Sequence, residues 1–171
     1  SVRVDDATRP DIDGREPILD ATRTRMAFLR NGDLFVRDLR TGQLSQITRT
    51  EATETQAQWT TGGGLVWRAG DDWYGWDPQR GTAQLTSLKA EADPTKPPPA
   101  DALRDRQLRM IETLRTERER RDALREQNET WRRADATRAP GPVYLGKDVT
   151  IAGSALSPAG DRLIVVTEPK D

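Results

Sequence analysis

The sequence of 171 residues contains no cysteine and no histidine. Without histidine it has no imidazole base, so a Ser-His-Asp or Cys-His triad within the chain is excluded. Without either residue a structural zinc site is not expected. No disulfide can form, so cysteine usage indicates no redox compartment. We therefore expect no catalytic residue, no metal and no cofactor in this chain.

An excess of one charge and long apolar runs are also lacking. The chain has 27 basic and 28 acidic residues, for a net charge of −1. This balance argues against broad electrostatic binding to nucleic acid. The longest apolar runs hold about five residues, far short of the ~20 that cross a bilayer. We expect neither a nucleic-acid partner nor a membrane span.

Residues 19–87 have the pattern of short strands joined by tight turns. The apolar run Met26–Leu29 is followed by Asn31-Gly32, the strongest short hairpin signal. A second apolar run and a second turn come next. Because the connections are short, neighbouring strands are predicted to be antiparallel.

The same pattern recurs along the chain. Residues 32–38 (GDLFVRD) match residues 70–77 (GDDWYGWD) with one extra residue. A third copy lies near the far end, where residues 156–166 align without gaps to residues 19–29. A period near 40 residues with about four short strands per unit is typical of β-propeller blades.

The distance between the second and third copies leaves room for an insertion. Residues 91–100 hold four prolines and are predicted to form a linker. Residues 101–135 lack glycine and proline and are rich in helix formers, which predicts a helix of roughly 50 Å with Asp101 as N-cap. Pro140 follows as a stop signal.

The predicted fold class is therefore mainly β with a long helical insertion, built from antiparallel β-propeller blades. Residues 1–90 hold a lead-in and two repeats, residues 91–142 the linker and charged helix, and residues 143–171 the start of a third repeat. About two and a half repeats make a partial propeller, since closure typically takes four to eight blades. We expect a piece of a longer protein, or edges closed by assembly.

The predicted helix has only a thin apolar stripe, which includes Met110, Leu114 and Trp131. This pattern favours a helix that rests one narrow edge on another surface while the rest is solvated. The arginines between residues 115 and 133 are interleaved with acids, as on a solvated helix. The alternative is a partner or homodimer contact through the stripe, with the tryptophan as anchor.

Four of the five tryptophans lie between residues 59 and 76. Trp59, Trp67 and Trp73 occupy positions that are apolar in the first repeat, so we expect them in the core rather than in a ligand platform. Trp76 aligns near Arg37, and we expect it to be exposed and a candidate interface residue.

Three aspartates in the second repeat, Asp71, Asp72 and Asp77, allow either a cation site or turn formation. Asp33 and Asp38 are their counterparts in the first repeat, and aspartate is a common turn former. The spacing also differs from an EF-hand loop. The turn interpretation is preferred.

Residues 156–165 (LSPAGDRLIV) resemble the signature W/L-S-P-D-G-K-x-I-x-F of Tol-associated and peptidase propellers. Residues 31–48 are similar to the D-G-N-L-Y-V-x-D-L-x-T-G-E…Q-L-T motif of the prolyl oligopeptidase family. The chain resembles in particular the dipeptidyl-peptidase IV branch of that family, over residues 19–87 and 143–171.

This resemblance implies a serine exopeptidase whose Ser-Asp-His site lies in a separate α/β-hydrolase domain C-terminal to the propeller. The chain would then gate the site, position peptide substrates or form a dimer contact. The resemblance alone favours a periplasmic location. Gly153-Ser154-Ala155 lacks the second glycine of Gly-x-Ser-x-Gly, and no adjacent glutamate pair is present, so no site residue is carried over. The alternative is a Tol-associated type of scaffold that uses the helix as a docking arm.

Overall fold

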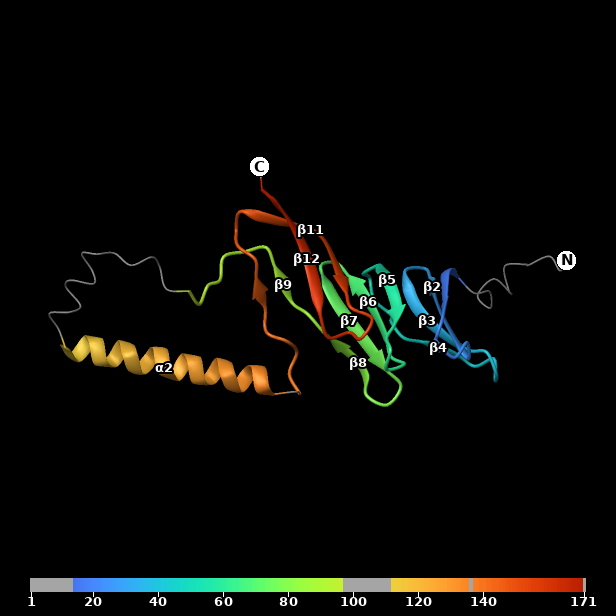
Figure 1. The fold of residues 1–171 in the computed structure, drawn as a ribbon, viewed down its shortest axis with the longest axis horizontal. Helices are drawn as coiled ribbons and strands as arrows, with labels where there is room; N and C mark the ends of the chain where they lie inside the picture. The colour runs from blue at the N-terminus through green and yellow to red at the C-terminus, as the bar shows by residue number, and fades with distance from the viewer. Residues whose placement is uncertain (1–13, 97–111, 136, 171) are drawn as a thin grey trace.

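The computed structural model describes residues 14–96, 112–135 and 137–170. Over this part the chain is mainly β, with antiparallel sheets and a single helix, as the sequence predicted, and with one short parallel pair of strands besides. The sheets follow one another in a row, and the helix lies to one side of them (Figure 1). The described sheets do not close into a ring, so their assignment as propeller blades stays a prediction.

The first sheet is a meander of four antiparallel strands. They are β1 (Arg15–Leu19), β2 (Arg25–Arg30), β3 (Asp33–Asp38) and β4 (Leu44–Gln46), paired in chain order. The predicted hairpin at Asn31-Gly32 joins β2 to β3, with φ of 55° and 91° at its two residues. Asparagine and glycine tolerate these positive φ values, which is why the pair specifies the turn.

The second sheet repeats this arrangement. Its strands are β5 (Glu54–Trp59), β6 (Leu65–Ala69), β7 (Asp72–Asp77) and β8 (Gly81–Gln84), again in chain order. Both sheets also share a side-chain anchor just after their last strand. The Thr48 hydroxyl accepts the Leu34 N–H at 2.8 Å, and the Thr86 hydroxyl accepts the Trp73 N–H at 2.8 Å.

The third copy of the sequence pattern forms a hairpin of β11 (Val149–Leu156) and β12 (Leu163–Pro169). Its turn has the same hydrogen bonds as the turns β1–β2 and β5–β6. In each turn the first residue both donates and accepts a backbone hydrogen bond with residues that follow it. The side chain of this first residue also accepts a backbone N–H. The three first residues are Asp20, Thr60 and Ser157. The sequence repeat therefore corresponds to a structural repeat.

The helix lies in a long segment between the second sheet and the third hairpin, and the two ends of this segment are paired with each other. β9 (Leu88–Lys89) pairs in parallel with β10 (Val143–Tyr144). Further backbone bonds from Val143 N–H to Ser87 at 2.7 Å and from Gly146 N–H to Glu91 at 3.1 Å extend this pairing. The two ends of this segment are thus held side by side.

Two apolar clusters join neighbouring sheets. The first lies between the two four-stranded sheets and contains Ala27, Leu34, Val36, Leu65 and Trp67. The second joins the second sheet to the third hairpin and contains Val66, Trp73 and Leu156. Trp67 and Trp73 are each 2% exposed, which confirms their predicted place in the core. Trp59 packs against the first cluster as a partly buried side chain.

Candidate interaction surface on helix α2

Helix α2 (Glu112–Ala134) ends close to the predicted stop. The Asp135 N–H makes a last helical bond to the Trp131 carbonyl at 3.1 Å. The Asp135 carboxylate then accepts the Thr137 hydroxyl and N–H, and these bonds lower its pKa. The expected start of the helix at Asp101 lies outside the described residues.

The side chains of α2 are almost wholly solvated. Leu114, Leu124 and Trp131 are 43%, 51% and 63% exposed, and of the described side chains on α2 only Glu129 is half-buried. None of these apolar side chains is buried by the described part of the chain itself, and the expected contact of the narrow edge with another surface stays a prediction. They stay exposed because three widely spaced apolar side chains among so many charges bury too little area to hold a helix against the sheets of this chain.

The three candidate interface residues that the structure describes do not form one surface. Leu114 and Trp131 project from α2, whereas Trp76 on β7 packs against the first apolar cluster and is half-buried rather than exposed. Met110 lies outside the described residues. Within the described part of α2, the apolar stripe also includes Leu124, which lies two helical turns before Trp131.

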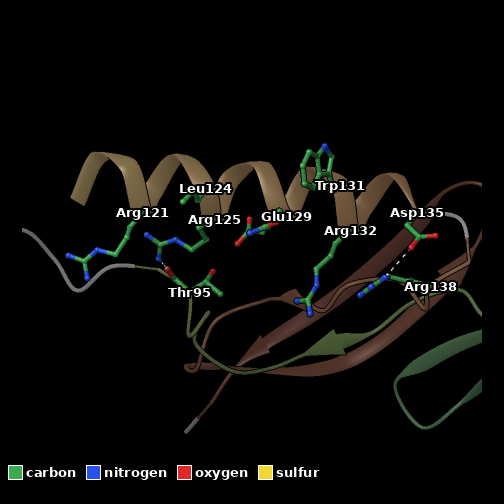
Figure 2. A pocket seen from close by; sticks show the side chains of 10 residues that line it. Thr95, Arg121, Leu124, Arg125, Glu129, Trp131, Arg132, Asp135 and Arg138 are labelled. Atoms are coloured by element: carbon green, nitrogen blue, oxygen red, sulfur yellow. Dashed lines mark hydrogen bonds and ion pairs between the residues drawn. The ribbon is translucent and has the colours of Figure 1, made fainter. Parts of the chain in front are cut away.

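A hollow of about 780 Å³ lies between α2 and the segment that contains Thr95 (Figure 2). Its charged lining is four arginines and two acids: Arg121, Arg125, Arg132, Arg138, Glu129 and Asp135. Arg125 donates to the Thr95 carbonyl at 3.1 Å and also pairs with Asp122. Arg138 pairs with Asp135 at 3.1 Å.

These ion pairs determine how strongly the hollow attracts charged groups. The arginines are exposed, and some are already neutralised by neighbouring acids, so the hollow attracts anions only weakly. Figure 2 shows Trp131 projecting away from Thr95. A second, shallower hollow of about 650 Å³ borders Leu124 and Trp131 on another side. Leu124 and Trp131 therefore lie at the border of two open hollows and remain exposed in both.

The aspartates considered for a cation site act in turns and strand ends. The Asp77 carboxylate accepts the Gln79 and Arg80 N–H groups at 2.8 and 3.0 Å. Asp72 accepts the Leu88 N–H at 2.7 Å. Asp71 pairs with Arg68 at 3.1 Å. Over the described residues no group of three or more potential metal ligands comes together.

Sequence reasoning missed two charged residues that the structure places at sheet junctions. Arg25 bridges the first two sheets, and Glu54 is buried at the start of β5 with 1% exposure. The signal for Glu54 was available in the repeat alignment, because the equivalent positions are Gly14 and Ile151. An acid at a position where the other copies have a glycine or an isoleucine breaks the repeat pattern, and such a break could have marked Glu54 as a candidate.

No family model matches the chain, and no curated protein matches it in sequence. Across the described segments, no helix combines the length and the apolar character needed to cross a membrane.

Proposed function

We propose that this chain is a non-catalytic part of a β-propeller that gates or positions peptide substrates for a separate α/β-hydrolase domain of a serine exopeptidase. The observation that carries the proposal is the structural repeat. Two four-stranded meanders and a third hairpin share one turn network and stack through apolar clusters. Radial repetition of such sheets is how a propeller is built.

The third hairpin supports this interpretation through its unburied apolar side chains. Ile164 and Val166 on β12 are 69% and 55% exposed. Their counterparts on β2 are Ala27, which is fully buried, and Leu29, which is half-buried. In the first sheet these positions are covered by a third strand and by the neighbouring sheet. We infer that β12 is covered in the same way in the complete propeller.

The peptidase part of the proposal rests on the resemblance of residues 31–48 and 156–165 to motifs of the prolyl oligopeptidase family. It is tested with an active-site fluorophosphonate probe. We expect the full product of the parent gene to be labelled at a serine and to release dipeptides from chromogenic substrates. This chain alone should show neither property. Failure of the full product to react, or labelling of this chain, would sink the proposal.

A second candidate is a Tol-associated type of scaffold in which α2 is the docking arm. The exposed pair Leu124 and Trp131 favours it, because tryptophan is a common interface anchor. Sedimentation velocity of the chain tests the homodimer form of this idea. Self-association that is lost in Trp131→Ser would support docking through the helix, whereas a monomer at high concentration would exclude the homodimer.

A further inference from the structure

A cleft of about 410 Å³ lies beside the second sheet, away from helix α2. One wall is the segment of residues 47–52 that joins β4 to β5. The other is the face of the second sheet that carries Trp67 and Tyr74. The cleft is thus built where the first two sheets meet.

Glu54 lines this cleft and has an incomplete set of hydrogen bonds. Its Oε1 accepts the Thr50 hydroxyl at 3.0 Å. Its Oε2 is buried and has no hydrogen-bond partner, and the residue as a whole is 1% exposed. A buried carboxylate oxygen without a partner is costly, so such a group is normally matched by a donor or a cation.

The fold does not require a carboxylate at this position. The first sheet has Gly14 at the equivalent site and the third hairpin has Ile151, and both hairpins form the same turn network. The acid at position 54 is therefore specific to this copy of the repeat, where it lines the cleft and holds Thr50 of the segment that joins β4 to β5.

The other lining groups indicate the chemistry of a ligand. Trp67 and Tyr74 stack with ring centroids 6.2 Å apart, and aromatic rings attract cations as well as apolar groups. A single carboxylate is a poor site for a metal ion, and no metal-ligand cluster forms among the described residues. Arg49 is the one basic residue in the lining, and its side chain is exposed at the rim.

We propose that the cleft binds a primary alkylammonium group. The Glu54 side chain turns so that Oε2, which is closed to solvent in the free chain, accepts the ammonium N–H, while the apolar stem lies along the partly exposed Tyr74 ring. The site is separate from the peptidase role proposed above and does not depend on it. The ammonium can belong to a free amine or to a lysine side chain, since both present the same group on an apolar stem.

The test is a titration of the full chain with n-pentylammonium, followed by amide NMR. We expect saturable shifts at the amides of Thr50, Glu54 and Ala69, and none with 1-pentanol or pentanoate at equal concentration. A parallel titration with N-acetyl-lysine amide separates the two sources. Tighter binding of the lysine derivative assigns the site to a side chain, and tighter binding of n-pentylammonium assigns it to a free amine.

Glu54→Gln keeps the shape of the side chain and removes its charge, and it should weaken n-pentylammonium binding by roughly tenfold or more. Glu51→Gln, at an exposed acid three residues away, is the matched control and should leave binding unchanged. Should Glu54→Gln fail to fold, the comparison of n-pentylammonium with 1-pentanol in the unaltered chain decides alone. Equal binding of the alcohol, unchanged binding in Glu54→Gln, or no saturable shift with either amine overturns the proposal.

Discussion

The Arg25 guanidinium lies 4.5 Å from the centre of the Trp59 ring and joins the first two sheets. Its Nη2 donates to the Gly63 carbonyl at 2.8 Å, and its Nε pairs with Asp20 at 3.2 Å. The Trp59 indole in turn donates to the Ile18 carbonyl at 3.1 Å. One side chain from each sheet thus reaches across the junction, so the two sheets are fixed by directional contacts as well as by apolar packing.

Replacing Arg25 tests this junction. Arg25→Met keeps much of the apolar stem but removes the cation and its donors, and we expect it to lower the free energy of unfolding by about 1–3 kcal/mol. Arg25→Lys should be intermediate, because lysine keeps the charge but loses the planar fork. Urea denaturation measures both. The exposed Arg80→Met is the control, and an equal loss there would contradict the bridging role.

Backbone strain in the equivalent turns predicts that two substitutions change the free energy of unfolding in opposite directions. Arg23, Gly63 and Gly160 occupy the same turn position with φ of 54°, 80° and 77°. Arg23→Gly should therefore stabilise the chain by about 0.5 kcal/mol, since it relieves a left-handed residue at some entropic cost. Gly160→Ala should destabilise it by about 1 kcal/mol, although the added Cβ meets only Thr60 Cγ2 at 3.6 Å.

The control for this pair is Arg40→Gly, in another exposed turn where φ is not positive. Thermal melts of the three variants give the comparison. Stabilisation by Arg40→Gly of the same size as by Arg23→Gly would mean that turn strain is not the cause.

The pH dependence of stability should carry a contribution from Asp20, which is 6% exposed. Burial by itself raises the pKa of this carboxyl. The N–H groups of Arg25 and Thr24, the Thr22 hydroxyl and the Arg25 guanidinium outweigh burial and hold the pKa well below its usual range. Because the unfolded chain then binds the proton more readily, the stabilisation is complete above about pH 4 and is lost as the pH falls further.

Asp20→Asn removes this titration. Its deficit in unfolding free energy against the unaltered chain should be largest near neutral pH and should shrink as the pH falls below about 4. Urea denaturation at a series of pH values measures the difference. A deficit that stays constant over the acid range would contradict the assignment to Asp20.

Local signals explain why much of the sheet structure could be predicted from the sequence. Asn31-Gly32 specifies its turn through positive φ at both residues, and the repeated turn residues place the strands of both meanders. The helix follows from a run without glycine or proline, and its end from Asp135 and the prolines beyond. Each of these signals acts over a few residues and does not depend on how the sheets pack.

The features that were missed depend on contacts between sheets. Trp76 aligns with Arg37 of the first repeat, and this charged counterpart suggested an exposed position. Both residues are half-buried, and Trp76 packs on the first apolar cluster, which the neighbouring sheet shares. Arg25 looks like an ordinary strand-end arginine until the second sheet supplies Trp59 and Gly63. Sequence periodicity cannot give these contacts, since it describes one sheet at a time.

Helix α2 should contribute little to the stability of the sheets. Leu124→Ser and Trp131→Ser remove side chains that are 51% and 63% exposed, and each should change the free energy of unfolding by less than about 0.5 kcal/mol. Denaturation monitored by the near-ultraviolet signal of the buried tryptophans measures this. A loss of several kcal/mol would mean that the helix packs on the sheets in solution.

The third hairpin is held to the second sheet by a buried hydrogen bond, in which the Trp73 indole donates to the Ser154 hydroxyl at 2.9 Å. Ser154→Ala strands that N–H in a site where Trp73 is 2% exposed, and it should cost about 1–3 kcal/mol. In a Trp73→Phe background the indole N–H is absent, so the same substitution should cost about 1 kcal/mol less. Urea denaturation of the four forms completes the double-mutant cycle. Equal costs in the two backgrounds would show that this hydrogen bond does not join the hairpin to the sheet. The junction would then rest on the apolar contact of Leu156 with Val66 and Trp73 and on the bonds from Gln58 Nε2 to the Leu156 carbonyl at 3.1 Å and from the Thr61 N–H to the Pro158 carbonyl at 2.9 Å.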